Sequence, residues 1–268
     1  MSFEKTLVFG PKLIFHKNKI IYPTILNLIP IALFSILFSL SLSKVANFLQ
    51  YNTIDDILLN TQIFVQLIKG LSGHIGLFII LLVLTSMTSI YLMCTYVEIG
   101  RDAYKNKKID LSRIMPVSAQ KIYSVFATYA LGAFSTFLLI FVMLLVSIPL
   151  KTAGVVLFLL SLLIVTLTAI PVFWILPVVI IFENKTGLNS IKRSLNITKE
   201  FLFKLYSTII VIWLITSVID RFLLYLPYIG FYLSIVGRLL FFSWKALTPV
   251  SFYYEYVKPK RTMEEDDL

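Results

Sequence analysis

The longest apolar stretch of the chain is residues 152–182, TAGVVLFLLSLLIVTLTAIPVFWILPVVIIF, and it contains no charged residue. A helix needs about 20 mostly apolar residues to cross the hydrocarbon layer of a bilayer. Five further stretches meet this criterion, at 20–43, 74–97, 122–148, 203–226 and 230–256. We therefore expect an all-α, polytopic membrane helix bundle of six transmembrane helices, forming a single domain over residues 1–268.

The composition excludes the soluble and disordered classes. The 268 residues are 58% hydrophobic and 14% charged, and the mean hydropathy is +0.89. A soluble domain carries about 25% charged residues, and disorder requires low hydrophobicity. The net charge of +10 comes from basic residues in short segments between the apolar runs. Basic residues in such places set the orientation of the helices in the membrane and attract anionic lipid, so we prefer these roles to nucleic-acid binding.

The distribution of lysine and arginine predicts the orientation. The segments on one side of the six runs hold 18 basic residues and those on the other side hold 4, while Arg238 and Lys245 lie inside the sixth run. Cytoplasmic loops carry the basic excess, so both termini are expected in the cytoplasm of a multi-pass plasma-membrane protein. This places the short basic segment 1–19 and the acidic tail 259–268 inside.

Two loops have helical spacing of apolar residues, and we expect each to form a short interfacial amphipathic helix. The outer loop starts with a capping-box-like sequence at 53–56 and continues to residue 68. In the inner loop after residue 183, an apolar stripe is formed by Leu188, Ile191, Leu195, Leu202 and Leu205. The basic residues Lys192, Arg193 and Lys199 lie off this stripe and are candidate contacts for anionic lipid. The alternative is an ordinary basic loop whose spacing happens to suit a helix.

Charged residues within or at the ends of the runs are the remaining candidates. Arg238 and Lys245 are seven residues apart and share one helix face, where they either line a polar pocket for an anion or pair quietly within the bundle. Glu98, Glu183 and Glu255 lie near the C-terminal ends of runs, where a carboxylate is disfavoured by the helix dipole. We expect these glutamates, together with Asp220, to form structural ion pairs.

No constellation for catalysis is evident. Cys94 is the single cysteine, and His16 and His74 fall on opposite sides of the membrane in the expected topology. Gly70-Leu71-Ser72-Gly73 matches the G-x-S-G of rhomboid intramembrane proteases, but the last four runs contain no histidine to activate a serine. We interpret Ser72 as part of the turn that enters the second helix, and we expect no cofactor or metal.

One stretch carries a family resemblance. Trp174-Ile175-Leu176-Pro177 through Glu183-Asn184, then Gly187 and Ser190 to Lys199, resembles the membrane domain fused to some glycerophosphodiester phosphodiesterases and its stand-alone relatives. The terminal Tyr253-Tyr254-Glu255-Tyr256-Val257-Lys258, and Gly100-Arg101 with Leu111, are similar to other parts of that domain. The resemblance implies a six-helix membrane domain without the phosphodiesterase reaction, which belongs to a separate soluble domain.

The pattern favours a multi-pass membrane protein that is not an enzyme and that interacts with membrane lipids, mainly anionic ones, or organises the membrane with a membrane-protein partner. The alternative is a small secondary transporter or channel that uses Arg238 and Lys245. A third interpretation, an intramembrane enzyme, is disfavoured by the missing nucleophile and base. Substrate, partner and oligomeric state are not encoded in any pattern that we recognise.

Overall fold

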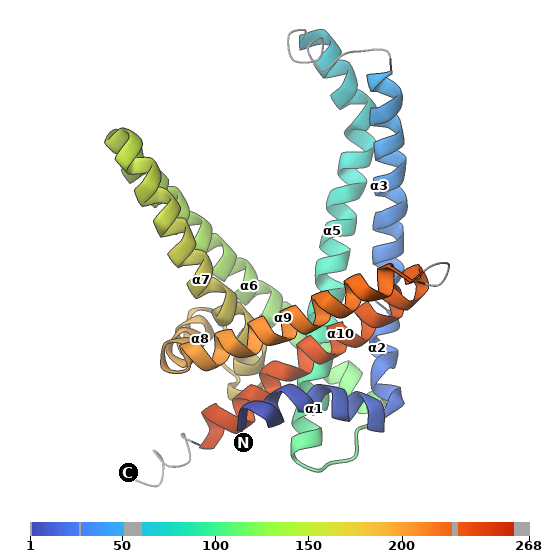
Figure 1. Ribbon diagram of the computed structural model, residues 1–268, viewed down its shortest axis with the longest axis vertical. Coiled ribbons are helices and arrows are strands. Elements are labelled where there is room, and N and C mark those ends of the chain that lie inside the picture. The colour runs from blue at the N-terminus through green and yellow to red at the C-terminus, as the bar shows by residue number, and fades with distance from the viewer. Residues whose placement is uncertain (1, 27, 51–60, 227–229, 260–268) are drawn as a thin grey trace. The chain divides into compact units, whose positions relative to one another are not determined.

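The computed structural model describes residues 2–26, 28–50, 61–226 and 230–259, which are 93% helical and contain no strand (Figure 1). The chain divides into two compact units, one formed by Met1–Tyr22 with Ile90–Leu268 and the other by Pro23–Ser89. The acidic tail from residue 260 and the capping-box sequence at 53–56 lie outside the described residues.

The smaller unit pairs α3 (Leu28–Leu49) with the first part of α5 (Thr61–Tyr104). The two helices run side by side, joined by an edge-on contact of Phe38 with Phe78 and by a hydrogen bond of 2.8 Å between Ser41 Oγ and His74 Nδ1 (Figure 1). The predicted first run at 20–43 is thus shifted, because the short helices η1 (Asn18–Ile21) and α2 (Tyr22–Ile25) precede α3.

The expectation for the outer loop is wrong from Thr61 onward, its residues 53–60 not being described, and the interpretation of Ser72 as part of a turn is wrong. From Thr61 onward the chain already belongs to α5, so residues 61–68 form the first turns of a 44-residue helix rather than a separate interfacial helix. Ser72 also lies within α5, where its hydroxyl donates to the carbonyl of Lys69 at 2.8 Å. The flanking Gly70 and Gly73 have no atom within 4 Å of a would-be Cβ, so no close approach demands glycine at either position.

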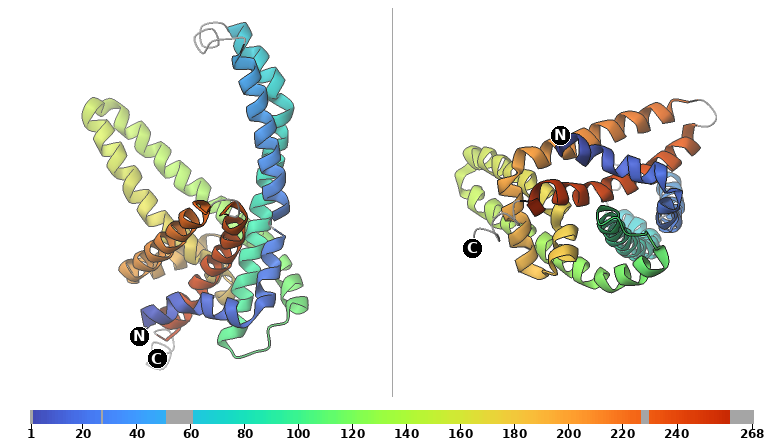
Figure 2. Two further views of the ribbon diagram at one scale, coloured as in Figure 1. Left: turned by 45° about the vertical axis from the view of Figure 1, so that its right-hand side comes forward. Right: turned by 90° about the horizontal axis from the view of Figure 1, so that it is seen from below.

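The larger unit contains two helical hairpins. The first joins α6 (Leu111–Ser147) to α7 (Lys151–Glu183) through the short η2 (Ile148–Leu150). The second consists of α9 (Leu202–Leu224) and α10 (Gly230–Phe252), and α10 continues into the π-helical turn η3 (Tyr253–Val257). The helix α8 (Gly187–Glu200) links the two hairpins, as Figures 1 and 2 show.

The N-terminal segment forms a helix that the sequence analysis did not anticipate. Helix α1 (Ser2–His16) packs along α10, and Trp244 of α10 donates its indole N–H to the carbonyl of Leu7 at 3.0 Å. A Cβ added at Gly10 would lie 2.6 Å from Trp244 Cδ1, so only glycine allows this approach. The segment is therefore part of the packed structure as well as a source of positive charge.

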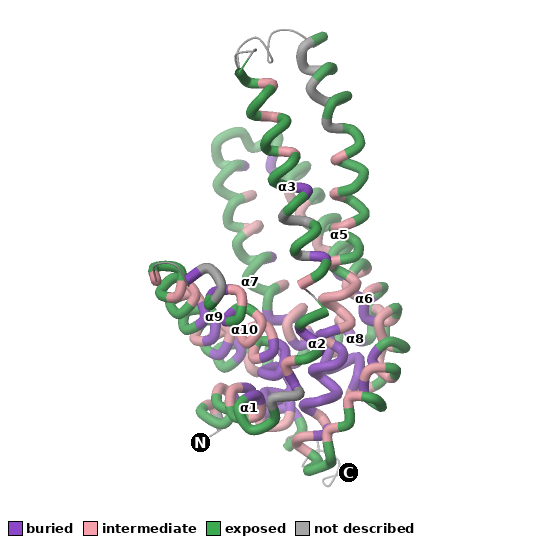
Figure 3. The backbone as a smooth tube through the Cα atoms, turned by 90° about the vertical axis from the view of Figure 1, so that its right-hand side faces the viewer, coloured by how far each residue is buried: buried purple, intermediate pink, exposed green. Residues whose placement is uncertain are grey.

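The buried core of the larger unit lies at one end of its helices. It combines the last turns of α5, α7 and α10, the first turns of α6 and α9, and α8, with Val97, Val125, Ile180, Leu205 and Phe252 among its members. Figure 3 shows the buried residues gathered there, while most of α7 beyond this end is exposed. We call this region the packed end.

The remaining helix surface is apolar and exposed, which indicates a membrane protein. Among the residues that the structure describes, four apolar segments are long enough to cross a bilayer: Ser72–Tyr104, Leu111–Glu183, Leu202–Leu224 and Leu233–Val257. In the most apolar window of each of the first two, only 11% of residues are buried. Apolar surface of this extent is unfavourable in water but suits acyl chains. The count is four rather than six, since Leu111–Glu183 includes both helices of the α6–α7 hairpin and α3 offers only Ile36–Leu49.

Candidate functional site

The carboxylate of Glu183 joins three elements at the packed end. Its Oε1 accepts hydrogen bonds from Arg193 Nε at 3.1 Å and from the Tyr253 hydroxyl at 2.9 Å, and its Oε2 accepts one from Lys185 Nζ at 2.8 Å. The side chain is only 2% exposed. The expected ion pair is therefore present, and it offsets the unfavourable position of a carboxylate at the C-terminus of α7. Arg193 has a structural partner and is not a free cation.

A second group of ion pairs lies where α5 meets the loop to α6. Glu98 and Asp102 are both buried, and they pair with Arg101 and Arg113 respectively. Glu98 does not end its helix as expected, because α5 continues to Tyr104. The extra turns of α5 place Asp102 beside Arg113. Buried carboxylates therefore neutralise part of the positive charge of this loop.

Glu255 differs from the other glutamates. Among the described residues it forms no ion pair, and its expected ion pair stays a prediction because Lys260 and Arg261 lie outside them. It lies instead beside the hydroxyl of Tyr104, which is 2.7 Å from Ser251 Oγ. The ring of Tyr104 stacks on Tyr254 with a centroid distance of 4.5 Å. The tyrosine-rich end thus packs by aromatic contacts and hydroxyl hydrogen bonds.

Helix α8 packs on the protein through a face that differs from its apolar stripe. Leu188 is 66% exposed, while Ile191 and Leu195 are half-buried. The residues of α8 that are buried against the bundle are mostly small and hydroxylated: Ser190, Ser194, Ile197 and Thr198. Small side chains let helices approach closely in membrane proteins, which explains the choice of face.

The basic residues of α8 border its exposed apolar face. At 100° per residue, Lys192 and Lys199 follow directly on the sector of Leu188 and Leu195, and both lysines are exposed. Leucines next to lysines on an outward face are typical of a helix that lies in the membrane interface, with apolar side chains among the acyl chains and ammonium groups among the headgroups. This geometry suits contact with anionic lipid.

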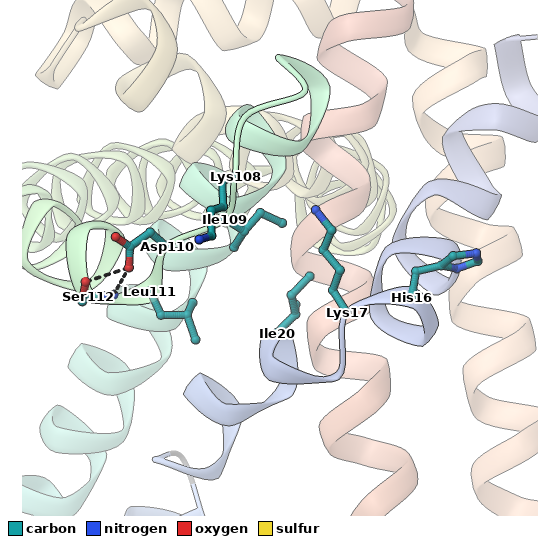
Figure 4. A pocket seen from close by; sticks show the side chains of 8 residues that line it. All are labelled: His16, Lys17, Ile20, Lys108, Ile109, Asp110, Leu111 and Ser112. Carbon is teal, nitrogen blue, oxygen red and sulfur yellow. Dashed lines mark hydrogen bonds between the residues drawn. The ribbon is translucent and has the colours of Figure 1, made fainter.

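A larger basic pocket lies between the end of α1 and the α5–α6 loop. It measures about 830 Å³ and is lined by His16, Lys17, Ile20, Lys108, Ile109, Asp110, Leu111 and Ser112. In Figure 4, Lys17 and Ile20 stand between His16 and the loop residues, and the His16 ring points away from the loop. Neither Lys17 nor Lys108 was singled out in the sequence, although both lie in segments rich in basic residues.

Asp110 serves the helix rather than a ligand. Its Oδ1 accepts hydrogen bonds from the hydroxyl and the backbone N–H of Ser112, at 2.7 and 3.0 Å, and so caps α6. These hydrogen bonds lower the pKa of Asp110 below its usual value. The carboxylate therefore stays ionised and occupied, and Lys17 and Lys108 remain the cationic groups of the pocket.

Arg238 and Lys245 line a smaller cavity between α9 and α10, of about 310 Å³. Arg238 donates to Asp220 through Nε and Nη2, with N–O distances of 3.1 to 3.3 Å, and Ser234 donates to the same carboxylate at 2.6 Å. The expected pair of Asp220 is thus present. Lys245 is exposed and has no ion pair within the described part of the chain.

Among the described residues, one serine and one histidine form a hydrogen bond with each other, and its donor and acceptor do not suit catalysis. Ser41 donates its only hydroxyl proton to the carbonyl of Leu37 at 2.8 Å. In the tautomer that carries its proton on Nδ1, His74 donates to Ser41 Oγ, the reverse of the arrangement in which a histidine removes the proton of a nucleophile. Over the residues described, no three of His, Cys, Asp and Glu gather to hold a metal ion.

Together the fold and these sites define an all-helical membrane protein with an ion-paired, basic packed end. Comparison of the chain with models of protein families, with curated protein sequences and with solved structures finds no match. The function must therefore be argued from the geometry.

Proposed function

We propose that this protein is a six-span plasma-membrane protein that binds anionic lipid headgroups at its packed end and thereby organises the surrounding membrane, alone or with a partner. In this proposal both termini and the packed end lie in the cytoplasm. The resemblance of residues 174–199 to the membrane domain of glycerophosphodiester phosphodiesterases remains part of the proposal and supports a non-catalytic membrane role.

The observation that carries the proposal is the surface of α8. Two lysines, Lys192 and Lys199, border the exposed Leu188 and the half-buried Leu195 on a helix whose opposite face packs on the bundle. Each basic residue near an anionic leaflet contributes about 1 kcal/mol. Lys17 and Lys108 add two more exposed cations on the same unit. A cation that already pairs with a buried carboxylate, such as Arg193, contributes less.

The lengths of the individual helices support six spans. Among the four apolar segments described above, one combines α6 with α7, and α3 is represented only by Ile36–Leu49. Helices α6 and α7 have 37 and 33 residues and fold back on each other, so each is long enough to cross separately. Helix α3 has 22 residues and reaches the required length. With α5, α9 and α10, this makes six.

The transporter or channel alternative rests on Arg238 and Lys245. Asp220 lines the same cavity, where it pairs with Arg238 and also interacts with the charge of Lys245, so these three groups together leave one net positive charge. A single cation in a cavity of about 310 Å³ is a weaker basis for transport than the α8 surface is for lipid binding. We therefore retain transport as the second candidate.

The test measures lipid enrichment around the full-length protein. In nanodiscs that contain phosphatidylglycerol and phosphatidylcholine, native mass spectrometry counts the lipids retained by the protein. We expect enrichment of phosphatidylglycerol, a clear loss in the double variant Lys192→Gln/Lys199→Gln, and weakening with salt. The control is Lys69→Gln/Lys151→Gln, which removes the same charge from the side that is expected to be extracellular. Equal enrichment in both double variants would overturn the proposal.

A further inference from the structure

The basic pocket between α1 and the α5–α6 loop brings together two lysines from distant parts of the sequence. Its volume of about 830 Å³ lies within the range of about 300–1,000 Å³ that small-molecule sites occupy. Lys17 directly follows α1, where its backbone N–H donates to the carbonyl of Leu13 at 3.1 Å. Lys108 belongs to the loop between α5 and α6. A ligand that contacts both lysines therefore joins the N-terminal helix to this loop.

The charged side chains that line the pocket leave it positive. Lys17 and Lys108 are exposed, and within the described part of the chain neither forms an ion pair. Asp110 also lines the pocket, but its Oδ1 accepts two hydrogen bonds from Ser112, and Figure 4 shows its carboxylate turned toward Ser112 and away from Lys17. With His16 neutral, two cations and one carboxylate give the lining one net positive charge, which suits a monoanion.

The rest of the lining is an apolar wall that the core holds in place. Ile20 is 1% exposed, and Ile109 and Leu111 are half-buried. All three belong to, or pack against, a buried cluster that includes Tyr96 and Ile114. The hydroxyl of Tyr96 also donates to the carbonyl of Ile20 at 2.8 Å. The wall is therefore preformed, and it can receive the apolar part of a ligand whose anionic group contacts the lysines.

The position of the pocket suits a ligand at the membrane surface. The α5–α6 loop joins two segments that are long enough to cross a bilayer, Ser72–Tyr104 and Leu111–Glu183. With these segments embedded, the loop faces the headgroup layer or the adjoining water rather than the acyl chains. Lysine binds phosphate as a point charge. The phosphodiester of a phospholipid carries one negative charge beside apolar ester and acyl groups, so it matches both parts of the lining.

We propose that this pocket binds one phosphodiester, with the phosphate between Lys17 and Lys108 and an adjoining apolar group on the wall. An anionic phospholipid such as phosphatidylglycerol has this chemistry. The inference rests on the proposed binding of anionic lipid, to which it adds a saturable site separate from the α8 surface. The α8 lysines attract lipids by charge along an exposed helix face, whereas the pocket holds a single molecule by charge and shape.

The test is a lipid titration of the full-length protein in detergent, in which native mass spectrometry gives the dissociation constant of the first bound ligand. The probes are phosphatidylglycerol, phosphatidylcholine, whose choline group cancels the phosphate charge, and glycerophosphoglycerol, which is the first headgroup without acyl chains. We expect phosphatidylglycerol to bind first and most tightly, and Lys17→Gln/Lys108→Gln to weaken this binding about 30-fold. Weaker binding of glycerophosphoglycerol would assign the pocket to a lipid, and equal, equally lysine-dependent binding would assign it to a water-soluble phosphodiester.

Matched variants separate the pocket from the general positive charge of the protein. Lys12→Gln/Lys107→Gln removes two exposed lysines from the same helix and the same loop, outside the pocket lining, and should leave the dissociation constant unchanged. Lys17→Arg/Lys108→Arg keeps both charges and should retain most of the binding. Thermal unfolding followed through the buried Cys94 shows that each variant is folded.

Three results would overturn the inference. The first is equal weakening in the pocket variant and in its matched control, because charge alone would then explain the binding. The second is an equal dissociation constant for phosphatidylglycerol and phosphatidylcholine. The third is a loss of first binding confined to Lys192→Gln/Lys199→Gln, which would leave the proposed function intact. A loss confined to the pocket variant would instead support the pocket and remove α8 as the basis of the proposed function.

Discussion

Replacing Glu183 by Gln removes the charge that joins α7, α8 and η3 while keeping the shape of the side chain. Gln can still accept the hydrogen bond of Tyr253, so the loss falls on the two cations. A hydrogen bond to a charged group contributes about 1.5–3 kcal/mol, which applies to Arg193, whose side chain is 29% exposed. Lys185 is 42% exposed, and water screens its pair to below about 1 kcal/mol. We expect Glu183→Gln to cost about 2–3 kcal/mol of stability.

The protein carries its own reporter for this measurement. Cys94 is the single cysteine and is fully buried, so a fluorogenic maleimide labels it only when the packed end opens. Thermal scans in detergent should give the largest loss for Glu183→Gln, an intermediate loss for Arg193→Gln and the smallest for Lys185→Gln. The double variant Glu183→Gln/Arg193→Gln should lose less than the sum of its two single variants, because both remove one interaction.

Two results would refute this reasoning. If Lys185→Gln destabilised the protein as much as Arg193→Gln, exposure would not govern the strength of the two pairs. If the double variant lost the full sum of both single effects, Glu183 and Arg193 would not interact. Either result would remove the basis for treating Arg193 as structural, and it would return this residue to the candidate lipid contacts.

Two further predictions concern the N-terminal helix and the topology. Gly10→Leu must displace Trp244 and loosen α1, so we expect backbone hydrogen exchange in α1 to rise about tenfold. The matched control is Gly70→Leu, because no atom lies within 4 Å of a Cβ built at Gly70. Unchanged exchange in Gly10→Leu would contradict the packing of α1 on Trp244. Reporter fusions after residues 110, 190 and 265 should give cytoplasmic signals, and a fusion after residue 52 should give an external one. An external signal at 110 or 190 would overturn the six-span topology.

Much of the architecture could be predicted because transmembrane helices are defined by local composition. The runs at 122–148, 152–182 and 203–226 correspond to α6, α7 and α9, since a helix satisfies its backbone hydrogen bonds within the segment. The partner of Glu183 could also be anticipated, because a carboxylate at a helix C-terminus needs a nearby cation and the next loop supplies several.

The errors arose where local composition did not decide the outcome. Local composition indicates only a basic segment at residues 1–19, because the packing of α1 depends on the contact of Gly10 with Trp244, which lies 234 positions later in the sequence. The apolar stripe of α8 predicts an amphipathic helix but does not decide which face packs on the protein. Next to lipid, leucines can face outward at little cost, and close packing selects serine and threonine for the protein side.

The sequence by itself determined that this is a helical membrane protein with an excess of basic residues between its apolar runs, because hydrophobicity and charge are properties of the chain. Only the tertiary structure decided which cations are free. Arg193, Arg238 and Lys245 look alike in the sequence, yet the first two are bound by Glu183 and Asp220 while Lys245 has no ion pair in the described part of the chain. The physical reason is that pairing depends on distances of about 3 Å between side chains on different helices, which helix packing sets.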